Sequence, residues 1–228
     1  MVRESQPILE VIVCTAVDAI EAEKGGAQRL ELIRDFARGG MTPSFETVAD
    51  VINSVSVPVR VMLRESESHH VFEESQIEQL CVHAREFAKF KIDGLVLGFL
   101  RDQKVDVEIT KRILSSVPEL KATFHHAFEH ARDSNEAIET LKSIRQIDRI
   151  LTAGGQGNWS QKIERLGLYE QLAGPEITIL AGGGLNKQHI QAIRAHTNIN
   201  EFHVGRAARL QFQIDGPVEA ENVKELVR

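Results

Sequence analysis

The stretch 177–209, ITILAGGGLNKQHIQAIRAHTNINEFHVGRAAR, decides the fold that this chain is expected to adopt. It holds two short apolar runs typical of strands, each followed by a glycine turn, AGGGLN (181–186) and HVGRAAR (203–209). Roughly twenty residues of helical pattern separate the two turns. In a barrel of alternating strands and helices, the loops after the last two strands often bind phosphate. The stretch therefore predicts the end of such a barrel and an anion site beside it.

The same alternation of strand and helix runs through the rest of the 228 residues. Strands are expected at Ile8–Val13, Arg29–Ile33, Val57–Leu63, Gly94–Phe99, Lys121–His125, Arg149–Thr152, Ile177–Ala181 and Glu201–Val204. Helices are expected between them, for example at Ala16–Lys24, Glu73–Phe90, Val107–Ser115, Asn135–Ile144, Lys187–Ala195 and Val218–Val227. This alternation indicates parallel strands joined by crossover helices, and hence an α/β fold.

We predict a single-domain (β/α)8 TIM barrel over residues 1–228, a length close to the ~250 residues typical of that fold. A doubly wound open sheet is the alternative. The count of eight strands favours closure, as does the absence of a GxGxxG turn after the first strand.

Composition narrows the classes of function. A net charge of -6 without a basic stripe argues against a nucleic-acid partner. No apolar run approaches the ~20 residues that cross a bilayer, and the first residues lack the apolar region of a signal peptide. Two cysteines give no disulfide framework, so a reducing, cytoplasmic location is expected and no membrane partner.

Several strands carry polar residues on the side that faces the barrel interior, because alternate side chains of a strand share a face. These residues are Glu10, Glu31, Arg60, Arg64, His125 and His203. Buried charges are costly unless they are paired, so their number indicates a polar site. For Glu10 and Arg60 a structural ion-pair network at the N-terminal end of the barrel is an equal alternative.

The catalytic candidates are Glu31, Arg64, His125, His203 and Glu10. The first four lie near the C-terminal strand ends, where the active sites of barrels form. Glu31 and His125 are placed to exchange protons, and Arg64 to hold a developing oxyanion.

The glycine turns supply the ligand-binding candidates, which are Thr152, Gly154, Gly183, Gly184, Gly205 and Arg206. Glycine lets backbone N–H groups approach an anion closely, and a following helix start favours negative charge. Arg206 adds a cation suited to phosphate or carboxylate. The alternative is that the glycines only make tight turns between strand and helix.

The histidines do not indicate a metal site. HHAFEH (125–130) and the pair His69-His70 place neighbours on opposite faces of any strand, and no HExxH or CxxC occurs. His126 and His130 would share a face only if that segment were helical. No metal ligands are therefore predicted.

The chain also resembles the CutC family, named for copper homeostasis, over about residues 8–206. The resemblance lies in LEV (9–11), EKGGAQRLEL (23–32), GGMTPS (39–44), VMLR (61–64), DGLVLG (93–98), TFHHAFE (123–129), DRILT (148–152) and GGGL (182–185). It implies a TIM barrel, a cytosolic homo-oligomer (dimer or tetramer), and a link to copper homeostasis and copper binding.

Two departures from the family pattern bear on copper. The family has cysteine where this chain has Ile12 and Ile33, and Cu(I) prefers thiolate and thioether ligands. Copper is thus implied by the resemblance alone, and the cofactor is left unassigned. Three functions stay open: a CutC-like copper protein, a lyase- or isomerase-type enzyme acting on a small anionic or phosphorylated metabolite, and a non-catalytic binding protein.

Overall fold

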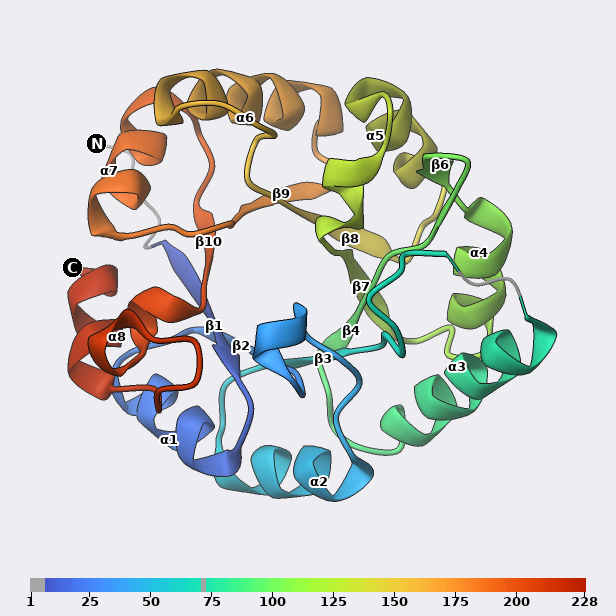
Figure 1. Ribbon diagram of the computed structural model, residues 1–228, viewed down its shortest axis with the longest axis horizontal. Helices are drawn as coiled ribbons and strands as arrows, with labels where there is room; N and C mark the ends of the chain where they lie inside the picture. Colours follow the sequence, from blue (N-terminus) through green and yellow to red (C-terminus); the bar gives the residue numbers. More distant parts are fainter. Residues whose placement is uncertain (1–6, 71–72) are drawn as a thin grey trace.

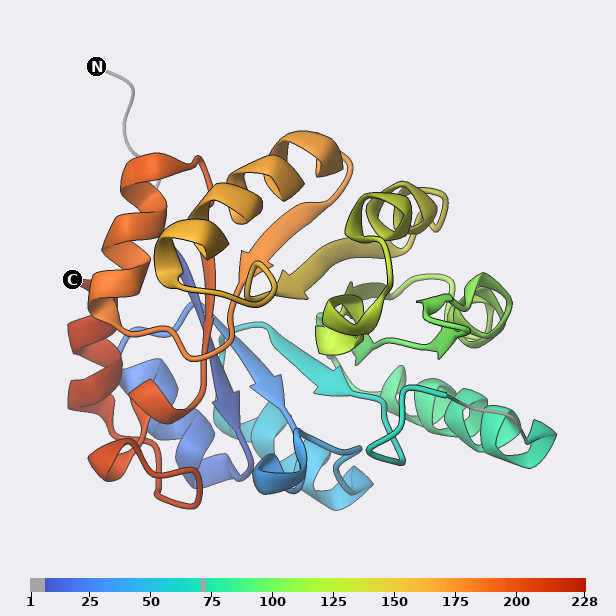
Figure 2. The same ribbon diagram turned by 45° about the horizontal axis from the view of Figure 1, so that its top comes forward.

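A closed barrel of parallel strands is surrounded by a ring of helices (Figures 1 and 2). The computed structural model describes residues 7–70 and 73–228. Its barrel strands are β1 (Ile8–Val13), β2 (Arg29–Leu32), β3 (Val59–Met62), β4 (Gly94–Leu97), β7 (Lys121–Phe124), β8 (Ile147–Thr152), β9 (Thr178–Ala181) and β10 (Glu201–Val204). The pairing of β1 with β10 closes the sheet, which confirms the TIM barrel and contradicts the open doubly wound alternative.

The ring consists of crossover helices that pack their apolar faces on the sheet. They are α1 (Ala16–Lys24), α2 (Phe45–Ser54), α3 (Glu74–Phe87), α4 (Val107–Ser115), α5 (Ser134–Lys142), α6 (Trp159–Ala173), α7 (Lys187–His196) and α8 (Ala220–Val227). Short 3-10 helices follow three strands at the C-terminal end of the barrel: η1 (Phe36–Arg38) after β2, η2 (His126–His130) after β7, and η3 (Arg206–Ala208) and η4 (Leu210–Phe212) after β10. None of the described helices is both long and apolar enough to cross a membrane.

The expected fourth strand ends two residues early, at Leu97, because the chain turns at Gly98. A Cβ on Gly98 would lie 2.5 Å from Nδ1 of His125, so glycine allows the backbone to pass close to that ring. The segment that follows makes an unexpected hairpin, β5 (Leu100–Arg101) and β6 (Lys104–Val105). The two residues of its turn include no glycine, so the sequence lacks the usual signal of a hairpin.

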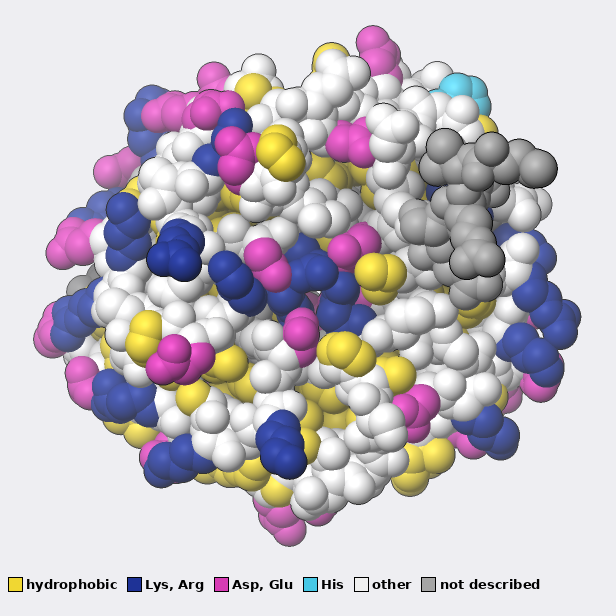
Figure 3. Space-filling view, turned by 180° about the vertical axis from the view of Figure 1, so that it is seen from behind, with side chains coloured by type: hydrophobic (Ala, Val, Ile, Leu, Met, Phe, Trp, Pro, Cys, Tyr) yellow, Lys and Arg dark blue, Asp and Glu magenta, His cyan; other side chains and the backbone are white. Residues whose placement is uncertain are grey.

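The barrel interior is divided along its axis. An apolar cluster of Ile12, Ile33, Met62 and Val96 lies inside β1 to β4. At the N-terminal end, charged side chains fill the interior instead. Figure 3 shows basic and acidic side chains together at the centre of this face.

Arg60 is the centre of one half of this charged layer and is only 1% exposed. Its guanidinium lies 2.8 Å from Asp93 and 2.7 Å from Asp148. In the other half, Arg29 donates to Glu201 at 2.6 Å. Arg60 therefore belongs to a structural ion-pair network, the alternative considered for it above, because its guanidinium bonds to carboxylates of this layer.

We expect Arg60→Met to lower the free energy of unfolding by about 3 kcal/mol, because it leaves partly buried carboxylates without their cation. Urea denaturation measures the loss. The matched control is Arg85→Met, whose ion pair with Glu78 is exposed and contributes less than about 0.5 kcal/mol. Equal losses in the two variants would contradict the structural role of Arg60.

Candidate functional site

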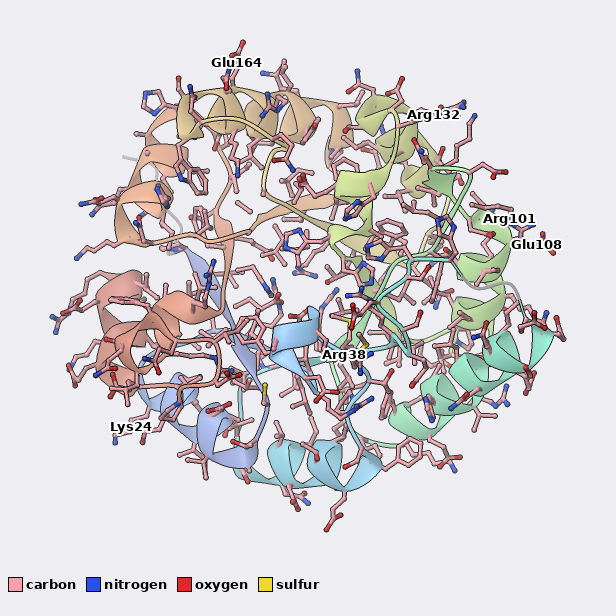
Figure 4. All side chains as sticks on the ribbon, viewed as in Figure 1. Lys24, Arg38, Arg101, Glu108, Arg132 and Glu164 are labelled. Carbon is pink, nitrogen blue, oxygen red and sulfur yellow. The ribbon has the colours of Figure 1, made fainter. Side chains whose placement is uncertain are left out.

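A cavity of about 810 Å³ opens at the C-terminal end of the barrel. Four catalytic candidates line it, Glu31, Arg64, His125 and His203, together with the binding candidates Gly183, Gly184, Gly205 and Arg206. The other three candidates, Glu10, Thr152 and Gly154, lie outside the lining. In Figure 4, Arg38 lies near the centre of this end of the barrel, whereas Lys24, Arg132 and Glu164 lie toward the outside of the molecule.

Strand register brings two carboxylates to one histidine. Glu10 pairs with His203 across β1 and β10, and Ile12 pairs with Glu31 across β1 and β2. As a result, His203 contacts Glu10 through Nδ1 at 2.8 Å and Glu31 through Nε2 at 3.5 Å. All three side chains are buried, so the carboxylates are within reach of only a few other polar groups. Glu10 also accepts a hydrogen bond from Arg29.

This environment shifts the pKa values of the three groups in different directions. Burial raises the pKa of Glu31 to about 7, and the nearby His203 charge only partly opposes the rise. Burial also acts to raise the pKa of Glu10, but Arg29 and then His203 outweigh it and hold that pKa well below its ordinary value. Burial acts to lower the pKa of His203, but Glu31 and Glu10 outweigh it and raise that pKa. The result is an anionic Glu10, a histidine that favours its charged form, and a Glu31 carboxyl that titrates near neutrality.

His125 follows β7, and its side chain is among those that line the cavity. Its Nδ1 accepts the backbone N–H of Ala127 at 3.1 Å, so the neutral ring carries its proton on Nε2. Among the described residues, this buried Nε2 has no hydrogen-bond partner. Burial, followed by the charges of His69 and Arg64, lowers the pKa of His125 well below its usual range. The ring is therefore a neutral N–H donor.

Two lining histidines were missed by the sequence prediction, His69 and His126. Neighbouring side chains point to opposite faces only while the chain is a strand. Because β7 ends at Phe124 and η2 begins at His126, His126 lines the cavity together with His125. The His69 ring lies 5.4 Å from that of His125, centre to centre. Burial lowers the pKa values of both His69 and His126 to about 4, which keeps these rings neutral.

Arg64 lines the cavity but uses three of its five N–H groups on backbone carbonyls. Nε donates to Ser66 at 2.9 Å, Nη1 to Gly39 at 3.2 Å and Nη2 to Glu67 at 2.6 Å. The guanidinium thus ties the loop after β2 to the loop after β3. These bonds hold the guanidinium between the two loops, and the oxyanion contact of Arg64 stays a prediction.

The glycine turns meet at the far side of the cavity from Arg64. Gly183 and Gly184 both have left-handed backbones, with φ of 80° and 87°, and open space lies where a Cβ of Gly184 would be. Their backbone N–H groups donate no hydrogen bond to any described residue. Arg206 is exposed on η3 and forms no ion pair with a described acidic side chain. We call Gly183, Gly184, Gly205 and Arg206 the anion cradle.

The binding candidates after β8 turn away from this cradle. The Thr152 hydroxyl donates to Glu129 and accepts the N–H of Gly154 at 3.0 Å. The carbonyl of Gly154 is in turn held by Arg165. These polar groups are bonded to Glu129 on η2, to each other and to Arg165 on α6, and neither Thr152 nor Gly154 lines the cavity. Glu10 likewise acts one layer below, through His203.

Glu31→Gln is expected to change the pH dependence of stability. The folded pKa of about 7 exceeds the ordinary 4.5, so the stabilising effect of the Glu31 proton is complete below pH 4.5 and is lost as pH rises through 7. Relative to the wild type, the variant should gain about 2–3 kcal/mol between pH 4 and pH 8. Chemical denaturation at both pH values measures this gain. A difference that does not vary with pH would contradict the assignment.

Comparison with known proteins identifies the family of the chain. The CutC family model matches residues 7–208. The human protein named copper homeostasis protein cutC homolog is 34% identical over 200 residues, covering 86% of this chain and 72% of its own. A family protein CutC from Xanthomonas axonopodis pv. citri is 30% identical over 210 residues, covering 92% and 87%.

A solved CutC structure from Streptococcus agalactiae has a TM-score of 0.80 and 24% identity, and covers 87% of this chain and 98% of its own. At that identity the likeness supports the fold. The family model and the two relatives together settle the relationship: the chain belongs to the CutC family.

Proposed function

We propose that this protein is an enzyme of the lyase or isomerase type that moves a proton on a small organic anion, a phosphate ester or a carboxylate. One observation carries the proposal. Glu31, a buried carboxyl with a pKa near 7, lines the same cavity as His125, whose buried Nε2 has no hydrogen-bond partner among the described residues. A general base is most effective when its pKa lies near the working pH.

Glu31 is the acid–base group. Near pH 7 it exists in both protonation states, so it can accept a proton from a carbon or oxygen of the substrate and return it elsewhere. His203 supports the ionised form from 3.5 Å, and Glu10 holds His203 in place from the other side. Both are positioning residues, because they act on the substrate through Glu31.

His125 is the hydrogen-bond donor for negative charge that develops on a substrate oxygen. A neutral imidazole suits this role because its proton is held firmly and its donor is already oriented by the Ala127 N–H. The low pKa of His125 makes proton exchange with Glu31, as the sequence suggested, the weaker assignment.

The anion cradle holds the charged group of the substrate. Backbone N–H groups of Gly183 and Gly184 approach from one loop and the Arg206 guanidinium from the next. Amides and a planar cation together match the oxygens of a phosphate or carboxylate. The unpaired amides support this role over the alternative of a simple turn.

A thiolate copper centre fits these residues poorly. Ile12 and Ile33 stand where the family pattern has cysteine, and both are buried in the apolar cluster. Cys14 is the nearby thiol, and burial raises its pKa, which disfavours the thiolate. Across residues 7–70 and 73–228, no three or more His, Cys, Asp or Glu side chains are grouped to hold a metal ion. Copper homeostasis stays a family-level association, and the cytoplasmic location and homo-oligomer stay predictions.

The test begins with a thermal-shift screen of small phosphorylated and carboxylated metabolites, since ligand binding raises the unfolding temperature. Compounds that bind are then incubated in D₂O, and proton NMR follows the loss of a C–H signal. We expect the wild type to catalyse this exchange and Glu31→Gln to slow it by about 100-fold or more while binding is retained.

The control is Glu65→Gln, which alters an acidic residue paired with His83 outside the cavity and should leave exchange unchanged. Arg206→Ala should weaken binding of every anionic compound. Binding that Arg206→Ala does not affect would contradict the anion cradle. Binding without any exchange would make the protein a non-catalytic binding protein.

A further inference from the structure

The cavity has two chemically different walls. Ile12, Ile33 and Met62 form one wall as part of the buried apolar cluster, and Phe36 packs against that cluster. Glu31 lies beside this wall, since it pairs with Ile12 across β1 and β2. His125 and His126 follow β7, which lies on the opposite side of the barrel from β1, and they form the other wall. A ligand held by the anion cradle therefore has an apolar surface on one side and polar groups on the other.

Phe36 is fixed directly beside the cradle. A Cβ on Gly205 would lie 2.3 Å from the tip of the Phe36 ring, so the absence of a side chain at Gly205 is what admits the ring. On its other side, the guanidinium of Arg209 lies 5.1 Å from the ring centre. The position of the ring makes the apolar wall continuous with the anion cradle.

A second aromatic ring stands at the mouth of the cavity. Phe212 lines the cavity and yet is 66% exposed. Its backbone and that of Gln211 are both left-handed, with φ of 58° and 52°, which costs energy for residues other than glycine. Backbone strain of this kind clusters at active sites and ligand clamps, and here it holds an apolar ring at the cavity.

The loop that carries Phe212 is firmly anchored at its base. Arg209 is buried, and its Nη1 donates to the Gly216 carbonyl at 2.6 Å across the base of the loop. Leu210 N–H bonds to the Pro217 carbonyl at 2.9 Å. The base therefore fixes where the loop stands, and Ile214 joins Phe212 in the lining.

We infer that the substrate of this site carries an apolar portion, aromatic or branched alkyl, attached to its phosphate or carboxylate. This inference rests on the proposed function for the anion cradle and adds the substrate class. The apolar portion lies against Ile12, Ile33 and Phe36, and Phe212 covers it. The two isoleucines that replace the family cysteines thus make the wall that selects this class.

The same wall disfavours polyhydroxylated substrates such as sugar phosphates. A hydroxyl placed against Ile12, Ile33 and Met62 loses its hydrogen bonds to water without gaining a partner there. An apolar group in the same place gains free energy as its surface leaves water. The two effects act in the same direction, so the preference is expected to be large enough to measure.

Calorimetric titration of the full chain with three probes tests the inference: inorganic phosphate, phenyl phosphate and glycerol phosphate. We expect phenyl phosphate to bind at least about tenfold more tightly than glycerol phosphate. Phe212→Ser should reduce that ratio several-fold and leave the affinity for inorganic phosphate unchanged. The matched control is Leu168→Ser, an exposed apolar residue on α6, which should leave the ratio as in the wild type.

The outcomes separate the two proposals. Equal binding of phenyl and glycerol phosphate, or a ratio unchanged in Phe212→Ser, would overturn the apolar substrate class while the anion cradle stands. If none of the three probes binds, the anion cradle fails, and with it the proposed function and this inference. Tighter binding of phenyl phosphate than of glycerol phosphate, with a smaller ratio in Phe212→Ser, supports both the anion cradle and the apolar substrate class.

Discussion

The contact of one buried histidine with two carboxylates is the interaction on which the rest of the site depends. His203 lies between Glu10 and Glu31, and the charge of each group affects the pKa of its neighbour. Glu10 keeps its charge because Arg29 and His203 face it, His203 favours its charged form because two carboxylates face it, and Glu31 is left as the group that titrates near neutrality. Burying three such groups is costly, and the layer of ion pairs beneath them makes it possible.

The barrel supplies this arrangement through strand register. β1 pairs with both β10 and β2, so its inward residues meet those of the two strands on either side. Moving any of these strands by one residue would turn Glu10, Glu31 or His203 toward the helices. The charged layer around Arg60 and the Glu10–His203–Glu31 contacts above it thus share a cause, since both occupy inward positions of closed parallel strands.

Much of this was predictable from the sequence because strand alternation is a strong signal. It placed Glu31, His125 and His203 inside the barrel, and it identified Arg60 as a residue with a structural alternative. What it missed depends on local turns. His126 reaches the cavity because β7 ends and a 3-10 helix begins. Arg64 donates to backbone carbonyls of two loops, and residue periodicity does not predict the path of a loop. Thr152 and Gly154 are drawn away by Glu129, a side-chain contact across 23 residues.

Ile12 and Ile33 give one side of the cavity its apolar character. Where thiols are implied by resemblance, Ile12 and Ile33 build an apolar wall that Phe36 continues to the anion cradle. In the proposed function, the site combines acid–base groups, an anion cradle and an apolar surface in one cavity.

The most direct test of this account is the pKa of Glu31 itself, measured by carbon-13 NMR of glutamate carboxyls with Glu31→Gln to assign the signal. The account predicts a titration midpoint near pH 7. A midpoint near the ordinary value of 4.5 would contradict it.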